Sequence, residues 1–180
     1  MEDLEHSATP EWGKFIARKL AATLKPRTRP SPASVPLNTT NLALGDAQPE
    51  IAEVGWLQPT ANRVPASDPI TSPLLDSGKL YATGLYAHAP SRYVFNLGGK
   101  WKELTGEAGL HTQHQPRGSV AFIIKADGQE VFHSAVIRRA RKASYKIDLT
   151  GVKKLGLIVD PTPDGKHNDW GLWLDPVLRR

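Results

Sequence analysis

Short runs of apolar residues with a period of two dominate the second half of the chain and predict β-strands. Apolar and polar positions alternate in residues 92–97 (RYVFNL) and 144–149 (SYKIDL), so that one face of each segment is apolar. Residues 119–125 (SVAFIIK) and 154–159 (KLGLIV) are apolar enough for strands buried on both faces. Asp127-Gly128 is a two-residue hairpin signal. The predicted strands are 92–97, 119–125, 129–133, 144–149, 154–159 and 171–178.

The spacing of these segments predicts an all-β fold. They follow one another at about ten-residue intervals with glycine-containing turns between them, which is typical of an antiparallel β-sandwich. No long helical pattern alternates with them, so a doubly wound parallel sheet is not expected. The chain of 180 residues contains 15 glycines, 15 prolines and no cysteine. The missing cysteines exclude a disulfide scaffold, a thiolate metal site and a cysteine nucleophile.

The first 45 residues differ from the rest and predict an N-terminal extension. Apolar residues recur at helical spacing in 10–25, which predicts a short amphipathic helix that either packs on the domain or binds a membrane surface or partner. The proline-rich stretch that follows, 25–41, predicts an extended linker. We therefore expect a helix and linker over 1–45 and the folded domain over 46–180.

Charge changes this picture only locally. The net charge is +5 and the sequence pI is near 9.5, with the densest basic run at Arg138, Arg139, Arg141 and Lys142. We interpret this run as a solvated hairpin or a surface for an acidic partner. Nucleic acid is not the expected ligand, because no aromatic residues are interleaved for base stacking. No apolar run is long enough for a membrane span, and the N-terminus lacks the apolar core of a signal peptide.

Catalytic motifs do not emerge from the sequence. The closest histidine pair, His111 and His114, lies in a polar segment (HTQHQPRG) that predicts a loop rather than a zinc site. The chain contains no HExxH, no GxSxG and no P-loop, and no carboxylate pair is placed as acid and base. We therefore expect a protein that is not an enzyme.

The loop at residues 160–169 (DPTPDGKHND) is the candidate metal site. Calcium takes oxygen ligands from carboxylates and carbonyls in loops, and Asp160 and Asp164 are the carboxylates we assign to it. Turn chemistry alone is the alternative explanation, because aspartate and asparagine favour tight turns.

Tryptophans suggest a binding surface. Trp170 and Trp173 are three positions apart, so on one strand they would face opposite sides, and one of them near the loop is a candidate platform for a sugar ring. Structural packing of both is the alternative. Trp56 and Trp101 are predicted to lie in the core.

Four ordered segments then point to a known family. Residues 84–99 (GLYAHAPSRYVFNLGG) contain G-x-x-x-H-A-x-S, and 118–128 (GSVAFIIKADG) contain G-S-V-x-F before Asp-Gly. Residues 148–155 (DLTGVKKL) and 169–178 (DWGLWLDPVL) follow, the second against a family pattern D-H-A-D-W-A-D-P-x-L. Together they resemble the NPCBM/NEW2 domain, also classed as carbohydrate-binding module family 51.

This resemblance implies a galactose-binding-like jelly-roll sandwich that is non-catalytic and binds terminal galactose-type sugars through loops at one rim. It also implies a structural calcium, attachment to a glycoside hydrolase or other larger parent protein, and a secreted or cell-envelope location. His88, Arg92 and Asp169 match family positions. The chain departs from the pattern at Trp170 and Leu172, where the family has His and Asp.

Our hypothesis is a carbohydrate-binding module. An aromatic platform and polar side chains would hold the glycan, and the predicted ligand-binding residues are Trp170, Asp169, His88, Arg92 and Asn168. The alternative is a protein–protein assembly module that kept the fold and lost the sugar site, which the apolar replacements at 170 and 172 favour.

Overall fold

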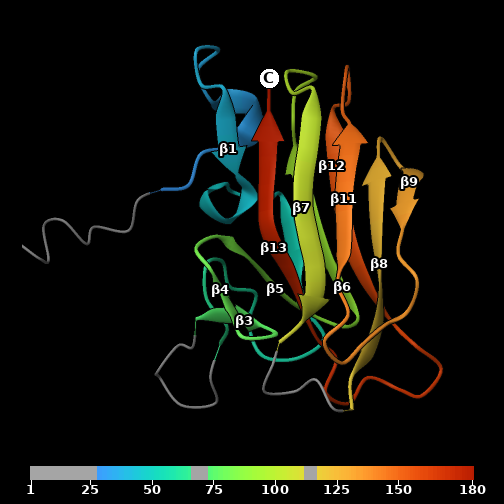
Figure 1. Ribbon diagram of the computed structural model, residues 1–180. Coiled ribbons are helices and arrows are strands. Elements are labelled where there is room, and N and C mark those ends of the chain that lie inside the picture. The colour runs from blue at the N-terminus through green and yellow to red at the C-terminus, as the bar shows by residue number, and fades with distance from the viewer. Residues whose placement is uncertain (1–27, 66–72, 112–116) are drawn as a thin grey trace, which may run out of the picture.

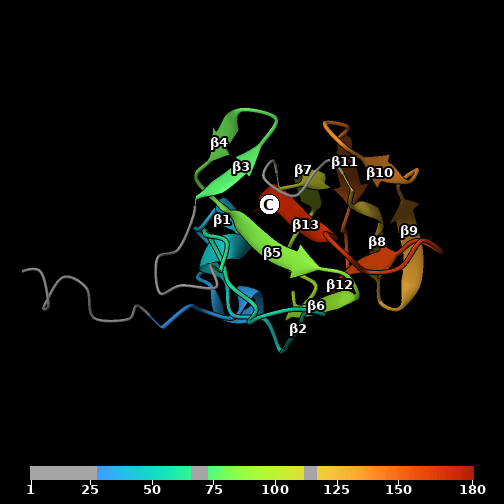
Figure 2. The same ribbon diagram turned by 90° about the horizontal axis from the view of Figure 1, so that it is seen from below.

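Two antiparallel sheets form the body of the molecule. The computed structural model describes residues 28–65, 73–111 and 117–180, and the helix predicted at 10–25 lies outside them. Figures 1 and 2 show the sheets facing each other with loops gathered at both ends. Within the described residues, no helix is long and apolar enough to cross a membrane.

The first sheet has the order β1-β13-β7-β11, and β5 pairs with the first half of β13. The second has the order β10-β8-β12-β6-β2, and β9 pairs with β8. Every pairing is antiparallel, which confirms the predicted all-β jelly-roll sandwich. The first sheet contains β1 (Asn41–Ala43), β5 (Gly84–His88), β7 (Glu103–Leu110), β11 (Ala143–Asp148) and β13 (Trp170–Arg179). The second contains β2 (Ile51–Glu53), β6 (Ser91–Asn96), β8 (Ser119–Ala126), β9 (Gln129–His133), β10 (Ile137–Arg138) and β12 (Lys154–Pro161).

Smaller elements complete the fold. A two-stranded hairpin lies against the first sheet, and two short 3-10 helices flank β1. These are β3 (Leu74–Asp76), β4 (Lys79–Tyr81), η1 (Pro32–Ser34) and η2 (Leu44–Asp46).

The main core lies between the two sheets and is built by alternation. On β6, Tyr93 and Phe95 point into it, as the apolar period predicts. Trp101 and Trp173 are both fully buried, which confirms the core prediction for Trp101. The ring of Trp173 meets that of Phe122 from the opposite sheet edge-on, with centroids 5.0 Å apart. Aromatic contacts of this geometry add to the free energy of burial.

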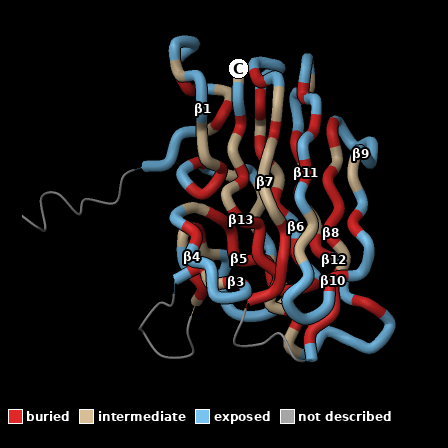
Figure 3. The backbone as a smooth tube through the Cα atoms, viewed as in Figure 1, coloured by how far each residue is buried: buried red, intermediate tan, exposed pale blue. Residues whose placement is uncertain are grey.

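A second hydrophobic cluster covers the outer face of the first sheet. Tyr86 and Leu172 project from β5 and β13 toward Leu74 and Tyr81 of the β3–β4 hairpin, and all four are buried. In Figure 3 the tube has the colour of buried residues along β5 and much of β13, beside the β3–β4 hairpin. Leu172, one of the two family departures, therefore packs in a core rather than facing a ligand.

The Asp127-Gly128 hairpin forms as predicted. Both residues have positive φ, 46° and 87°, which the tight turn between β8 and β9 requires. The Asp127 carboxylate also accepts hydrogen bonds from the backbone N–H groups of Lys153 and Lys154. The turn is thereby tied to the start of β12.

The predicted linker is wrong for its described part. β1 pairs with the end of β13, and Val35 and Leu44 are buried. The Trp101 indole N–H donates to the carbonyl of Pro32 at 3.2 Å, and the Arg180 guanidinium lies 4.3 Å from the Trp101 ring centroid. These contacts supply the apolar surface that the prolines could not bury alone, so the sandwich includes residues from about 30 onward.

The basic run at 138–142 is not a hairpin. β10 pairs with β8 in the second sheet, whereas β11 pairs with β7 in the first. The turn between them therefore crosses from one sheet to the other, closed by a hydrogen bond from the Arg141 N–H to the Arg138 carbonyl.

Candidate functional site

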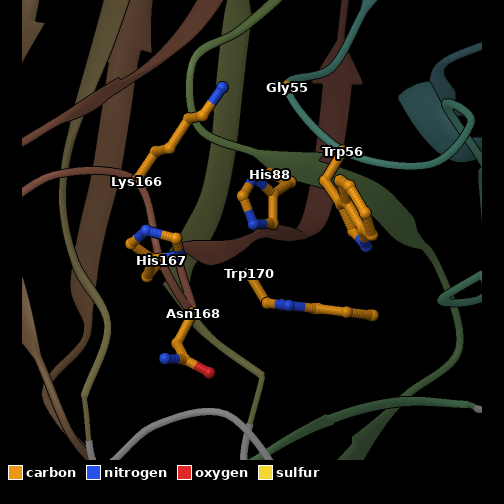
Figure 4. A pocket seen from close by; sticks show the side chains of 7 residues that line it. All are labelled: Gly55, Trp56, His88, Lys166, His167, Asn168 and Trp170. Atoms are coloured by element: carbon orange, nitrogen blue, oxygen red, sulfur yellow. The ribbon is translucent and has the colours of Figure 1, made fainter.

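A pocket of about 310 Å³ opens at the end of the sandwich where β5 ends and β13 begins. Three separate segments line it: the loop after β2, the last residue of β5, and the loop from β12 into β13. In Figure 4 the rings of Trp56 and Trp170 lie on one side of His88, and the loop side chains lie on the other. The lining residues are Gly55, Trp56, His88, Lys166, His167, Asn168 and Trp170.

Strand register places the two central rings. His88 and Trp170 are direct partners in the β5–β13 pair, and their ring centroids are 6.1 Å apart. The Trp170 ring also meets the buried Tyr86 ring edge-on at 5.3 Å. His88 Nδ1 donates to the Ala89 carbonyl at 2.8 Å, which fixes the ring orientation. The buried His111 ring lies 6.3 Å from the Trp170 ring as well, and Trp170 itself is only partly buried.

Trp56 is the residue that the sequence prediction misplaced. We expected it in the core, but its side chain is 58% exposed at the mouth of the pocket. Two bonds hold its loop on β5: the Gly55 N–H donates to the His88 carbonyl at 2.9 Å, and the Tyr86 hydroxyl to the Trp56 carbonyl at 3.2 Å. A Cβ at position 55 would overlap the Ala89 carbonyl, so this close approach requires glycine.

The polar wall comes from the loop before β13. Lys166 and His167 are exposed, and Asn168 is partly buried with a φ of 66°. The Trp170 N–H donates to the Asn168 carbonyl at 2.9 Å. This compact turn places the amide of Asn168 and the ring of Trp170 at the same pocket.

Asp169 lies behind the pocket and does not line it. It is 1% exposed, and one carboxylate oxygen accepts the Ser119 N–H at 2.8 Å. The other oxygen has no hydrogen-bond partner within the described residues. Burial raises the pKa of this carboxyl to about 6, and the nearby charge of Asp164 acts in the same direction. Asp169 therefore anchors the loop to β8 rather than presenting itself to a ligand.

Arg92 is outside the pocket. It lies on β6 of the second sheet, opposite Glu53 and Ile158, and its side chain is exposed on the outer face. The chain crosses from the first sheet to the second between His88 and Ser91, so the two neighbours in the motif separate in space.

The calcium residues do not form a fitting donor set. Both oxygens of Asp164 accept from the Ser119 hydroxyl, at 2.7 and 2.8 Å, and Thr162 also donates to this carboxylate. The Arg138 guanidinium pairs with Asp164 at 3.2 Å, a position where a calcium ion would be repelled. In the part of the chain that the structure describes, no three His, Cys, Asp or Glu side chains cluster around a common point. Asp160 is exposed at the end of β12.

The structure thus unites three of the five predicted ligand residues, Trp170, His88 and Asn168, and adds Trp56, Lys166 and His167. A pocket of partly exposed indole rings beside amide, ammonium and imidazole groups can stack a flat apolar surface and hydrogen-bond hydroxyls around it. Its described lining residues include no Ser, Thr, Cys, Asp or Glu side chain that would act as a nucleophile or carboxylate catalyst.

An antiparallel sandwich whose end loops surround such a pocket has the architecture of a ligand-binding module. The model of the NPCBM/NEW2 domain matches residues 40–179, and the chain belongs to this family.

Solved structures agree in fold. A CBM51 domain from Clostridium perfringens GH95, solved with methyl-galactose, is 19% identical with a TM-score of 0.64 and covers 77% of this chain and 99% of that one. A structure of the CBM51-2 domain in complex with GlcNAc and the INT domains of Clostridium perfringens ZmpB is 20% identical in sequence, with a TM-score of 0.66. The match covers 78% of this chain and 31% of that one. A ZmpB structure that includes the M60 catalytic domain and two CBM51 domains is 28% identical, with a TM-score of 0.66, over 77% of this chain and 15% of that one.

One curated relative also matches. A protein of Renibacterium salmoninarum, whose name assigns it as an endo-alpha-N-acetylgalactosaminidase, is 28% identical over 102 residues. The match covers 56% of this chain and 7% of that protein, so this chain corresponds to a small part of its relative.

Proposed function

We propose that this domain is a non-catalytic carbohydrate-binding module whose glycan site is the pocket between Trp56, His88 and Trp170. The observation that carries the proposal is the pair of partly exposed tryptophans at one pocket, beside polar side chains of the 166–168 loop. The C–H face of a pyranose is flat and apolar, so it is complementary to an indole ring.

The pocket geometry and the ligands of the solved relatives support a terminal sugar as the ligand. One family-51 domain was solved with methyl-galactose and another with GlcNAc, so a single terminal sugar of galactose type is the first candidate. Its hydroxyl groups would meet Asn168, Lys166 and His88. We also propose that the module serves a larger glycan-degrading protein, since the relatives named above include a hydrolase and a catalytic-domain structure.

Binding should be weak and reversible. A pocket of about 310 Å³ that is open to water buries little surface, and a monosaccharide must lose its own hydration to enter it. We therefore expect a dissociation constant for methyl-galactose in the millimolar range, at about 4 kcal/mol of binding free energy.

The test is a titration of the 180-residue protein with methyl-galactose and with GlcNAc, monitored by NMR chemical-shift changes. Trp56→Ala should weaken binding about tenfold and leave the unfolding transition unchanged, because the side chain is 58% exposed. Trp170→Ala should abolish measurable binding, with a modest loss of stability from its contact with Tyr86.

Leu37→Ala is the matched control, since Leu37 is 74% exposed and is not among the pocket residues. It should leave both affinity and stability unchanged. If neither sugar shifts any resonance of a pocket residue at tens of millimolar, the sugar site is absent. The exposed indole of Trp56 would then support the alternative, a module that docks on another protein.

A further inference from the structure

A second hollow, lined by basic side chains, lies beside the pocket of Trp56, His88 and Trp170, which we call the aromatic pocket. Its volume is about 620 Å³, within the usual range of small-ligand sites. We name it the arginine hollow after Arg117, Arg138, Arg139 and Arg141. Gly118, Val136 and Ala140 complete its lining.

Three of these four arginines have no ion-pair partner among the described residues. The Arg138 guanidinium forms an ion pair with the Asp164 carboxylate, with an N–O distance of 3.2 Å. Within the described residues, the guanidinium groups of Arg117, Arg139 and Arg141 form no ion pair or hydrogen bond. All three are exposed. Three like charges gathered around one hollow repel one another, and an anion between them would relieve that repulsion.

The backbone that holds these arginines is specialised. Arg139 has a φ of 55° in the turn between β10 and β11, a conformation that glycine or asparagine adopts at lower cost. The turn is closed by the Arg141 N–H and oriented by the Arg138–Asp164 pair. Arg139 and Arg141 therefore extend from one closed turn, whereas Arg117 lies just before β8. Planar guanidinium groups bind carboxylate and sulfate oxygens in a bidentate manner.

The arginine hollow and the aromatic pocket share a wall. Gly118 lines the hollow, and a Cβ on it would overlap the carbonyl oxygen of Asn168, which lines the pocket. The loop that contains Asn168 also contains Asp164, the partner of Arg138. The end of this loop is bonded to the start of β8, because the Asp169 carboxylate accepts the Ser119 N–H at 2.8 Å. One extended ligand can therefore contact both sites.

We infer that Arg117, Arg139 and Arg141 form an anion subsite for a sulfate or carboxylate group of a glycan whose neighbouring sugar occupies the aromatic pocket. This inference rests on the proposed sugar site for the second half of the ligand. Val136, 43% exposed, offers the acidic sugar an apolar contact in the same hollow. No aromatic side chain is among the lining residues of the hollow, so a nucleic acid would find no stacking surface there.

The experiment compares binding to a sulfated galactan, its desulfated form, polygalacturonate and a single-stranded DNA 20-mer at two salt concentrations. The wild type should bind the sulfated galactan about tenfold more tightly than the desulfated one at low salt, and high salt should reduce this preference. In Arg139→Gln/Arg141→Gln the preference should disappear, while affinity for methyl-galactose stays unchanged. Lys125→Gln/Lys153→Gln removes the same charge from residues outside both hollows and should retain the preference.

The two proposals fail separately. Equal binding of sulfated and desulfated galactan by the wild type overturns the anion subsite even if methyl-galactose binds. Loss of the preference in the lysine control as well would show a general charge effect and also overturn it. Binding of the sulfated galactan that depends on Arg139 and Arg141, without any methyl-galactose binding, supports the subsite and refutes the neutral sugar site. DNA bound as tightly as the sulfated galactan overturns the inference in favour of nucleic acid.

Arginine-dependent binding of polygalacturonate supports a carboxylate as the anion.

Discussion

Replacement of Asp169 by asparagine should make the protein more stable at neutral pH and remove part of its pH dependence. One oxygen of Asp169 accepts the Ser119 N–H, and the buried carboxyl has a pKa raised to about 6. The folded state therefore favours the protonated form. Asparagine is nearly isosteric, keeps the acceptor for Ser119 and is neutral at every pH.

The magnitude follows from the pKa difference. The ordinary value is 3.8, so the folded state binds the proton more tightly by about two pH units. At 1.36 kcal/mol per unit, ionised Asp169 costs about 3 kcal/mol of stability at pH 7. This cost is absent below about pH 3, where the carboxyl is protonated in both states. It grows as the pH rises through the unfolded-state pKa of 3.8 and levels off above the folded-state pKa of about 6.

Urea unfolding at pH 4, 5, 6 and 7, followed by tryptophan fluorescence, measures the difference between variant and wild type. Asp169→Asn should exceed the wild type by only about 0.5 kcal/mol at pH 4 and by up to about 3 kcal/mol at pH 7. Asp160→Asn is the control, because it removes the same charge from an exposed position beside the same loop. A difference that is constant with pH, or a variant that loses stability at pH 7, would refute the assignment of a destabilised carboxylate.

Three further substitutions test the packing around the site. Gly118→Ala should cost about 2 kcal/mol, visible in thermal unfolding, because its Cβ would overlap the Asn168 carbonyl. Leu172→Asp restores the polar residue of the family pattern and should cost about 3 kcal/mol or more, because position 172 is fully buried. An unchanged urea midpoint would contradict the place of Leu172 in the second hydrophobic cluster. Tyr81→Phe should cost about 1 kcal/mol, because it removes the hydrogen bond that the hydroxyl donates to Glu107 and the one that it accepts from Lys142. The cost should be smaller in a Glu107→Ala background, where the first of these bonds is already absent.

The strands that the sequence predicted are those whose partners are close in sequence or whose faces differ sharply in polarity. β8 and β9 follow from alternation and the Asp127-Gly128 turn, and β12 from its apolar run. β1 could not be found in the same way, since three residues of modest polarity become a strand only because the end of β13 offers them an edge. Its existence depends on a contact 130 residues or more away in sequence.

For the candidate site, too, local sequence patterns predicted some residues and could not predict others. His88 and Trp170 come together through the register of two strands, which the family motifs indicated, although no local pattern contains that register. Arg92 is near His88 in the motif but lies outside the pocket, and the alternation that predicts Phe95 in the core already places Arg92 on the outer face. Trp56 was missed because its segment has no period, so nothing local distinguishes a buried indole from an exposed one.

The alternation of side chains along β13 explains why one of its two tryptophans is buried in the main core and the other lines the pocket. Trp170 and Leu172 lie on the outer face of the first sheet, and Trp173 lies on the inner face, as a period of two requires. A bulge at Asp175, with a φ of 44°, then shifts the register so that the end of the strand again turns an apolar residue into the core. The β3–β4 hairpin covers the outer face at Leu172 but not the strand end at position 170. A tryptophan at that end is therefore only partly buried, against Tyr86, His88 and His111, and the rest of its surface lines the pocket.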